Sequence, residues 1–312
     1  MSVLRLHPSC TDYIWGGERL REDFSIQSDK HPLAEAWVLS CHPDGPSTIA
    51  NGPDAGKTLT DYIAAHGKAV LGANCARFEN FPVLIKLIDA KNDLSIQVHP
   101  SNEYALANEH QYGKTEMWYI LDCAPGAFLY YGFRHEIGKE EFARRIADGT
   151  LLEVLNAAPV RRGDVFFIPS GTLHAIGKGI VLAEVQQNSN VTYRVYDYGR
   201  LGADGKPRAL HVQKALDVTN CVPPKTDYDF NGHLAKCEYF TVDTFDGSFD
   251  DTCDGASFTS LLIVDGAGTI ACGGETLPVK KGDSLFLPAG SGRYTLTDTG
   301  ALRTLRTRVG TD

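Results

Sequence analysis

Several features are missing from this 312-residue sequence, and each absence excludes a class of protein. No run of about 18 apolar residues occurs, so no transmembrane helix or membrane partner is expected. The first residues, Met1 to Pro8, lack the apolar core of a secretion signal, and we therefore expect a cytoplasmic protein. Lys and Arg number 30 against 39 Asp and Glu, and the resulting net charge of −9 argues against nucleic-acid binding.

The eight cysteines contain no Cys-x-x-Cys pair, so they offer no clustered thiolates for a closed structural zinc site. In a chain of this size without a secretion signal, thiols more often stay reduced than form disulfides. We therefore interpret the cysteines mainly as small core residues. They are Cys10, Cys41, Cys75, Cys123, Cys221, Cys237, Cys253 and Cys272.

Short β-type runs separated by Gly, Pro, Asn and Asp dominate the sequence, a pattern that predicts a barrel or sandwich. Helical spacing occurs at Leu59–Leu71 and Lys139–Leu155, and more weakly at Asn102–His110. The predicted fold class is mainly β with a few inserted helices. The predicted strands include Phe81–Ile88, Met117–Leu121, Asp164–Ile168, Ile180–Gln186, Val191–Tyr196, Phe258–Val264 and Ser284–Leu287.

A degenerate repeat relates two parts of the chain. Residues 159–174 match residues 278–293 without a gap: a basic turn and Gly-Asp lead into an apolar strand that ends at Pro-x-Gly. Repetition of a whole strand–turn unit predicts two related barrels in tandem. The turn-rich segment Cys221–Asn231 is the natural junction. We predict a catalytic, metal-binding domain at 1–222 and a smaller degenerate domain without metal at 232–312.

The first copy of the repeat carries the pattern Gly163-x5-Pro169-x-Gly171-x2-His174, which fits the second motif of the cupin barrel, a double-stranded β-helix or jelly roll. In that motif His174 points inward from the returning strand. The alternative is a surface histidine after a turn.

Two other segments supply partners for His174. Gln97 and His99 alternate along a predicted strand and share one of its faces, and Glu116 stands at the head of another, where a carboxylate is a solvated loop charge in most proteins. Together the four residues offer two imidazoles, a carboxylate and an amide oxygen. This set suits one Zn²⁺ per chain, with positions left for water or substrate. Iron or manganese would accept the same ligands.

Motifs along nearly the whole chain resemble the short bacterial form of class I mannose-6-phosphate isomerase, a cupin family. The combination of Gln-Val-His-Pro with Gly-Lys-Thr-Glu is much more specific than any single cupin motif. The matching segments are Ile14-Trp-Gly-Gly17, Ala34-Glu-Ala-Trp37, Lys86-Leu-Ile-Asp89, Leu94-Ser-Ile-Gln-Val-His-Pro100, Gly113-Lys-Thr-Glu-Met-Trp118, Pro169-Ser-Gly-Thr-Leu-His-Ala-Ile176 and Val191-Thr-Tyr-Arg-Val-Tyr-Asp197.

The resemblance implies an enzyme that interconverts mannose 6-phosphate and fructose 6-phosphate through an enediol. It implies zinc held at the positions of His99, Glu116 and His174, with the Gln97 position a ligand in longer relatives. It also makes Arg194 the catalytic arginine and a candidate for substrate binding. The expected oligomeric state is a monomer or a homodimer.

Three further residues are candidates for catalysis or substrate binding. Lys114 precedes Glu116 by two residues and shares its strand face, which suits proton transfer or substrate anchoring. Glu184 lies ten residues before Arg194, as an active-site acid does in longer family members; a barrel salt bridge is the alternative. Lys86 is a candidate for the phosphate or the hydroxyls, or else an ordinary edge lysine. Trp15, Trp37 and Tyr119 are either sugar-site aromatics or core residues.

Other functions remain open because a fold does not fix an activity. Another sugar-phosphate isomerase, or a dioxygenase with a 2-His-1-carboxylate iron site, could use His99, Glu116 and His174. A noncatalytic sugar-binding cupin is a third possibility, which the presence of the ligands disfavours. A phosphorylated substrate also requires a local group of Lys and Arg, because the chain as a whole is acidic.

Overall fold

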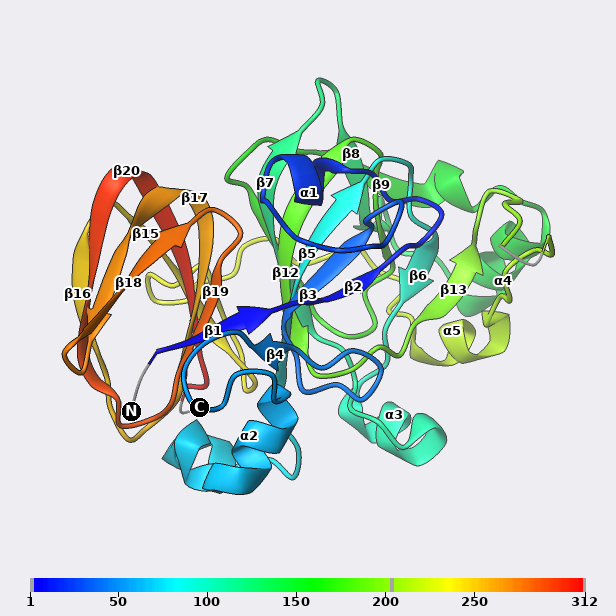
Figure 1. Cartoon of the computed structure of the whole chain (residues 1–312). Coiled ribbons are helices and arrows are strands. Elements are labelled where there is room, and N and C mark those ends of the chain that lie inside the picture. Colours follow the sequence, from blue (N-terminus) through cyan, green and yellow to red (C-terminus); the bar gives the residue numbers. More distant parts are fainter. Residues whose placement is uncertain (1–2, 203–204, 311–312) are drawn as a thin grey trace.

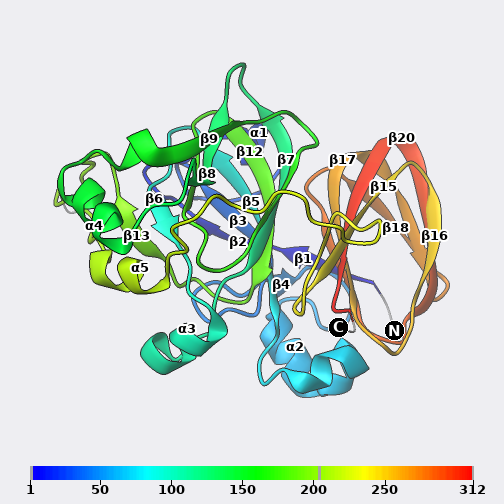
Figure 2. The ribbon, with the colours of Figure 1, turned by 180° about the vertical axis from the view of Figure 1, so that it is seen from behind.

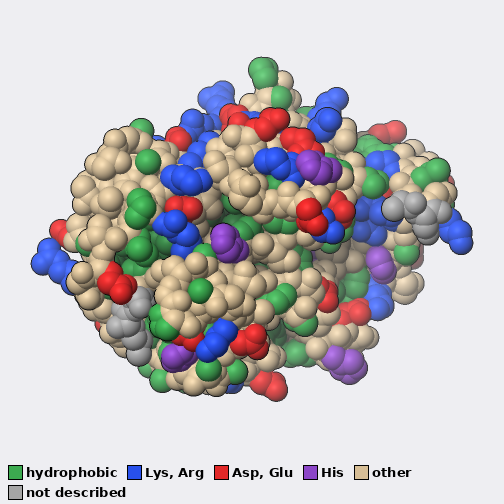
Figure 3. All heavy atoms as spheres, in the orientation of Figure 1, with side chains coloured by type: hydrophobic (Ala, Val, Ile, Leu, Met, Phe, Trp, Pro, Cys, Tyr) green, Lys and Arg blue, Asp and Glu red, His purple; other side chains and the backbone are tan. Residues whose placement is uncertain are grey.

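The computed structural model describes residues 3–202 and 205–310, which form two β barrels side by side (Figure 1). A six-stranded and a five-stranded sheet form the first barrel, and a nine-stranded sheet forms the second. The predicted class, mainly β with tandem cupin barrels and a few helices, is confirmed. Across the described ranges, no helix combines the length and apolar character needed to cross a membrane. On the face in Figure 3, basic and acidic side chains are interspersed.

The first barrel places two sheets face to face. The six-stranded sheet has the order β10 (Val165–Ile168), β7 (Glu116–Cys123), β12 (Ile180–Gln187), β5 (Val83–Ala90), β3 (Glu35–Leu39) and β2 (Ser9–Thr11). The five-stranded sheet has the order β13 (Tyr193–Tyr196), β6 (Ile96–Val98), β11 (His174–Ile176), β8 (Phe128–Phe133) and β9 (Leu155–Pro159). All pairings within both sheets are antiparallel.

The six-stranded sheet is buried on both faces, and this explains why its strands read as nearly continuous apolar runs. Along β5, Val83, Ile85 and Leu87 belong to a large core cluster that also contains residues of the second barrel. The alternate residues Lys86 and Ile88 point into the first barrel and line its cavity. The charged residues on the inner face of the sheet are therefore exceptions among apolar neighbours.

The second barrel takes strands from both ends of the chain. Its sheet contains β14 (Ala235–Lys236), β15 (Thr241–Asp246), β16 (Phe249–Cys253), β17 (Thr259–Cys272), β18 (Glu275–Lys280), β19 (Ser284–Leu287) and β20 (Gly292–Arg308), together with β1 (Leu4–His7) and β4 (Thr48–Ile49). Strand β1 pairs antiparallel with β19, and its residue Leu4 lies opposite Phe286. The first fifty residues thus contribute strands to both barrels, an exchange that the predicted division at 1–222 and 232–312 does not include. Figure 2 shows the connection around residues 219–234 passing from one barrel to the other.

Glycines end two helices earlier than the sequence pattern suggested. The helix expected over residues 59–71 stops at His66, because Gly67 takes a left-handed φ of 81°. The helix expected over residues 139–155 stops at Ala147, shortly before Gly149, whose φ is 68°. Helices α1 and α5 were not predicted. The helices are α1 (Arg19–Glu22), α2 (Leu59–His66), α3 (Asn102–Glu109), α4 (Lys139–Ala147) and α5 (Val212–Val218), with 3₁₀ turns at Lys68–Leu71, Ala73–Arg77 and Leu151–Val154.

The repeated segment of the second barrel has no counterpart of the predicted metal ligands. Arg293, which aligns with His174, has a side chain that is 75% exposed and pairs with Asp250 at 3.3 Å. Thr259 begins β17 as Glu116 begins β7, and it accepts a hydrogen bond of 2.9 Å from Arg308 Nε. An ion pair and a hydrogen bond therefore occupy the positions that carry the predicted ligands in the first barrel.

Packing between the barrels should dominate stability, and Phe286→Ala tests this. The Phe286 ring is fully buried in the shared core and stacks on Phe258 with 5.2 Å between centroids. The cavity left by its removal should cost about 3–5 kcal/mol, measured as a lower urea midpoint. Leu106→Ala, at a side chain 49% exposed, is the control and should change stability by less than about 0.5 kcal/mol. If the two substitutions changed the free energy of unfolding equally, the interface between the barrels would not dominate stability.

Candidate active site

The inner face of the six-stranded sheet presents a row of unusual side chains. Trp37, Lys86, Glu184 and Trp118 lie directly opposite one another on β3, β5, β12 and β7. Cross-strand neighbours of this kind have Cβ atoms about 5 Å apart and share one face of the sheet. The strand register therefore places a lysine and a carboxylate between two indoles inside the barrel.

A second row faces it from the five-stranded sheet. Arg194, Gln97 and His174 lie opposite one another on β13, β6 and β11. His99 follows the end of β6, two residues after Gln97, and is buried. The predicted ligands thus come from different parts of the chain and converge between the two sheets.

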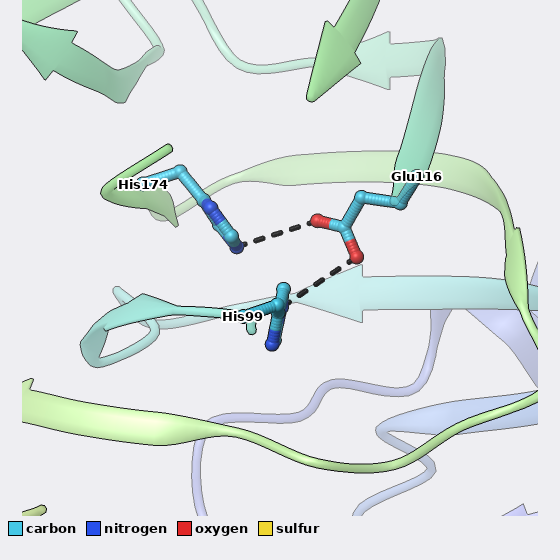
Figure 4. A group of neighbouring side chains, drawn as sticks. All are labelled: His99, Glu116 and His174. Atoms are coloured by element: carbon cyan, nitrogen blue, oxygen red, sulfur yellow. Dashed lines mark ion pairs between the residues drawn. The ribbon is translucent and has the colours of Figure 1, made fainter. Parts of the chain in front are cut away.

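His99, Glu116 and His174 form a fully buried group whose ligand atoms all lie within 4.8 Å of one another (Figure 4). His174 Nε2 is 3.3 Å from Glu116 Oε1, and His99 Nε2 is 3.6 Å from Glu116 Oε2. In the described ranges it is the only such cluster of His, Cys, Asp or Glu. Gln97 lies beside the group in the cavity wall.

Both imidazoles are held with one nitrogen facing the centre of this group. His99 Nδ1 lies 2.8 Å from the carbonyl oxygen of Val191, and His174 Nδ1 lies 2.8 Å from that of Thr172. These carbonyls can only accept, so they select the Nδ1–H tautomer and leave the Nε2 lone pair of each ring directed into the group. Burial and Lys114 lower the pKa of His99 well below its usual value and that of His174 to about 4. Both rings are therefore neutral at pH 7, as metal binding requires.

The spacing of the group and its two unpartnered atoms fit a small divalent cation. Glu116 Oε1 and His174 Nε2 are buried without a hydrogen bond to any described residue, although unpaired buried polar atoms are costly. Tetrahedral ligands about 2.1 Å from zinc lie about 3.4 Å apart, which matches the separations observed between imidazole nitrogens and carboxylate oxygens. The residues present therefore fit a bound metal ion.

Lys114 connects the His-Glu-His group to the cavity. Its ammonium contacts the Glu116 carboxylate and lies 3.2 Å from His99 Nε2 and 3.5 Å from Glu184 Oε1. Burial and the Glu184 carboxylate raise the pKa of Glu116 to about 8, against the pull of Lys114, and a divalent cation bound to the group would favour the carboxylate form. Burial also acts to raise the pKa of Glu184, but Lys114, Lys86 and the indole N–H of Trp118 outweigh it and lower that pKa to about 2. Glu184 is thus a carboxylate at neutral pH.

Lys86 lies on a central strand, so the edge-lysine alternative is wrong. Its ammonium is 3.5 Å from both Glu184 Oε1 and Glu35 Oε2. Sequence reasoning did not single out Glu35. The available signal was a carboxylate two residues before Trp37 inside a five-residue strand that is otherwise apolar and buried throughout.

These side chains border a cavity of about 290 Å³. Lys114, Glu184 and Gln97 line one part of it, and Trp15 and Trp37 line the wall. Tyr119 is a core residue instead: it packs in the cluster shared by the barrels, on the opposite face of its sheet.

A group of arginines marks another part of the cavity wall. Arg194 and Arg208 line the cavity, and Arg194 donates to Ser95 Oγ at 3.2 Å. Asp197 accepts hydrogen bonds from Arg208 at 2.6 and 2.7 Å and also from Arg200. Asp197 compensates Arg208 and Arg200, and Arg194 adds a third guanidinium, so this region has the excess positive charge that an acidic chain needs to bind an anion. Sequence reasoning identified only Arg194 of this group.

Fold and site together define a cupin-type protein with a buried two-histidine, one-glutamate centre at the side of a polar cavity. Residues 3–120 match the family Phosphomannose isomerase type I, catalytic domain, and residues 231–307 match Mannose-6-phosphate isomerase, cupin domain.

Similar proteins cover almost the whole chain. The mannose-6-phosphate isomerase of Streptococcus mutans is 39% identical, over 88% of this chain and 89% of its own. Mannose-6-phosphate isomerase ManA of Bacillus subtilis is 38% identical, over 93% and 94%. The crystal structure of the mannose 6-phosphate isomerase from Bacillus subtilis superposes with a TM-score of 0.90 at 37% identity, covering 98% and 99% of the two chains. The chain belongs to the type I mannose-6-phosphate isomerase family, as the sequence motifs predicted.

Asp197 should stabilise the arginine side of the cavity, and Asp197→Asn tests this. Burial acts to raise the pKa of Asp197, but Arg208 and Arg200 outweigh it and lower the pKa. A lowered folded-state pKa means that the stabilisation is present above the unfolded value of about 3.9 and disappears as pH falls through the folded value. The variant should lose about 1.5–3 kcal/mol at pH 7 in urea unfolding. The difference from the parent should shrink below about pH 4, and a difference that persists there would contradict this role.

Proposed function

We propose that this chain interconverts mannose 6-phosphate and fructose 6-phosphate with one Zn²⁺ bound at His99, Glu116 and His174. The observation that carries the proposal is the placement of a neutral His pair and a carboxylate beside a cavity that also presents an arginine group. One region suits a cation that binds sugar oxygens, and the other suits a phosphate. Gln97, beside His174, is the proposed additional protein ligand.

The reaction moves a proton between C1 and C2 of the open-chain sugar through an enediol. It requires stabilisation of negative charge on the sugar oxygens, a base for the carbon-bound proton, and a proton carrier for the oxygens. A bound zinc ion would supply the first of these by polarising the oxygens. The other two requirements fall to side chains of the cavity.

Lys114 and Glu184 are the groups that we assign to proton movement. Both line the cavity, both are buried, and their charged atoms are 3.5 Å apart. As a carboxylate at neutral pH, Glu184 can accept a proton, while the Lys114 ammonium can donate one. Lys86 faces the same cavity and is proposed to bind the sugar hydroxyls.

Arg194 and Arg208 are the groups that we assign to the anionic parts of the substrate. Burial and the neighbouring Arg208 lower the pKa of Arg194, but a guanidinium stays charged at pH 7. Arg194 lies directly opposite Gln97 on the neighbouring strand, so it can reach negative charge that develops on the sugar. Arg208 is fixed by Asp197 and is proposed to hold the phosphate.

Metal content and turnover should be lost together in His174→Ala. The substitution removes one of the imidazole ligands, so metal analysis should find much less than one zinc per chain and a coupled assay should find almost no isomerase activity. His233→Ala is the matched control, since that ring pairs with Asp243 at 2.6 Å in the second barrel. A His174→Ala protein with full metal content, or a parent enzyme that keeps its rate after exhaustive chelation, would refute the zinc assignment.

Arg194→Ala and Arg208→Ala should separate transition-state stabilisation from phosphate binding. Loss of Arg194 should lower kcat by about a hundredfold, the size typical for a group that stabilises developing negative charge. Loss of Arg208 should mainly raise KM for mannose 6-phosphate. Steady-state kinetics of the two variants measure this, and a near-normal kcat for Arg194→Ala would reduce that residue to a structural role.

A further inference from the structure

Buried charges of alternating sign run across the inner face of the six-stranded sheet. Starting from β3, the order is Glu35, Lys86, Glu184, Lys114 and Glu116, and each neighbouring pair lies within 3.5 Å. All five side chains are at least nine-tenths buried. The proposed function assigns a role to four of these residues: Glu116 as a metal ligand, Lys114 and Glu184 as proton carriers, and Lys86 in sugar binding. Glu35, at the far end of the series, has no role so far.

Glu35 is held in place by a partner other than Lys86. Its Oε2 accepts a hydrogen bond of 2.7 Å from Trp37 Nε1, on the same strand and the same face. The Lys86 ammonium lies over the Trp37 ring, 4.9 Å from its centroid, and 3.5 Å from the Glu35 carboxylate. At the other end Glu184 is held in the same manner by the indole of Trp118, at 2.8 Å. The Lys86 ammonium therefore lies between the Glu35 and Glu184 carboxylates, each of which is held by a tryptophan indole.

We infer that Glu35 is a positioning residue, which holds the Lys86 ammonium in the cavity at the place where it meets the sugar. Without it, Glu184 would be the remaining close carboxylate of Lys86, and the ammonium would shift toward Glu184. A flexible four-carbon side chain needs two anchors to present its charge in one place. The burial of the ammonium also favours full compensation of its charge, because an unpaired buried charge is expensive. Consistent with this, Glu35 and Glu184 keep the pKa of Lys86 raised although burial acts to lower it.

This inference rests on the proposed isomerase function, so the experiment first establishes turnover of mannose 6-phosphate by the parent enzyme. Glu35→Gln keeps an oxygen for the Trp37 indole and nearly the same volume while it removes the charge. It is compared with Lys86→Met and with the double variant in a double-mutant cycle. Each protein is assayed for kcat/KM and, by calorimetry, for affinity toward mannitol 6-phosphate, an open-chain polyol phosphate that cannot be isomerised. The binding measurement remains informative where turnover is lost.

If Glu35 acts through Lys86, Glu35→Gln should lower kcat/KM and affinity by about tenfold in the parent and by less than about twofold in the Lys86→Met background. The control is Asp243→Asn, which breaks an ion pair with Arg306 in the second barrel. It should lower the thermal midpoint and leave kcat/KM unchanged, showing that lost stability alone does not alter catalysis. Equal losses on both backgrounds, or no loss on either, would overturn the inference. A parent enzyme without turnover would refute the proposed function instead.

Discussion

The structure depends on pairing buried charges inside the first barrel. Three carboxylates and two ammonium groups lie between its sheets with almost no exposure to solvent. An isolated charge buried in such a place would cost several kcal/mol. The fold accommodates these five groups because each of them lies beside a group of opposite charge. The strand register provides this arrangement, since Lys86 lies directly opposite Glu184 on the neighbouring strand. A shift of one residue would turn these groups to the other face of the sheet, into the apolar core.

That other face explains the second barrel. Alternate residues of the same strands, such as Ile85, Met117 and Val185, form a broad apolar surface that would otherwise meet water. The second barrel covers it with Phe258, Phe286 and their neighbours. Strand β1, from the beginning of the chain, pairs with β19 and joins the two halves. The repeat has thus kept its apolar scaffold, while the ion pair of Arg293 with Asp250 occupies the position of the predicted ligand His174.

The cavity reconciles an acidic chain with an anionic substrate. The net charge of −9 would repel a phosphorylated sugar at long range, but screening limits this effect to about 8–10 Å at physiological salt. Within that distance the local excess of guanidinium groups around Asp197 dominates. In the proposed function, the arginines would bind the phosphate, and a cation at the neighbouring His-Glu-His group would bind the sugar oxygens.

The sequence by itself determined the fold class, the family, and the His99, Glu116 and His174 group, because these follow from local motifs and strand periodicity. It also indicated Lys114, Glu184 and Arg194, each within a recognisable segment. The tertiary structure alone decided which of the charged residues meet. Glu35 and Lys86 are about fifty residues apart, and only the pairing of β3 with β5 brings their charges together. Arg208 and Asp197 were missed for a related reason: exposed arginines and aspartates are common, and sequence periodicity does not reveal which of them a loop folds over a cavity.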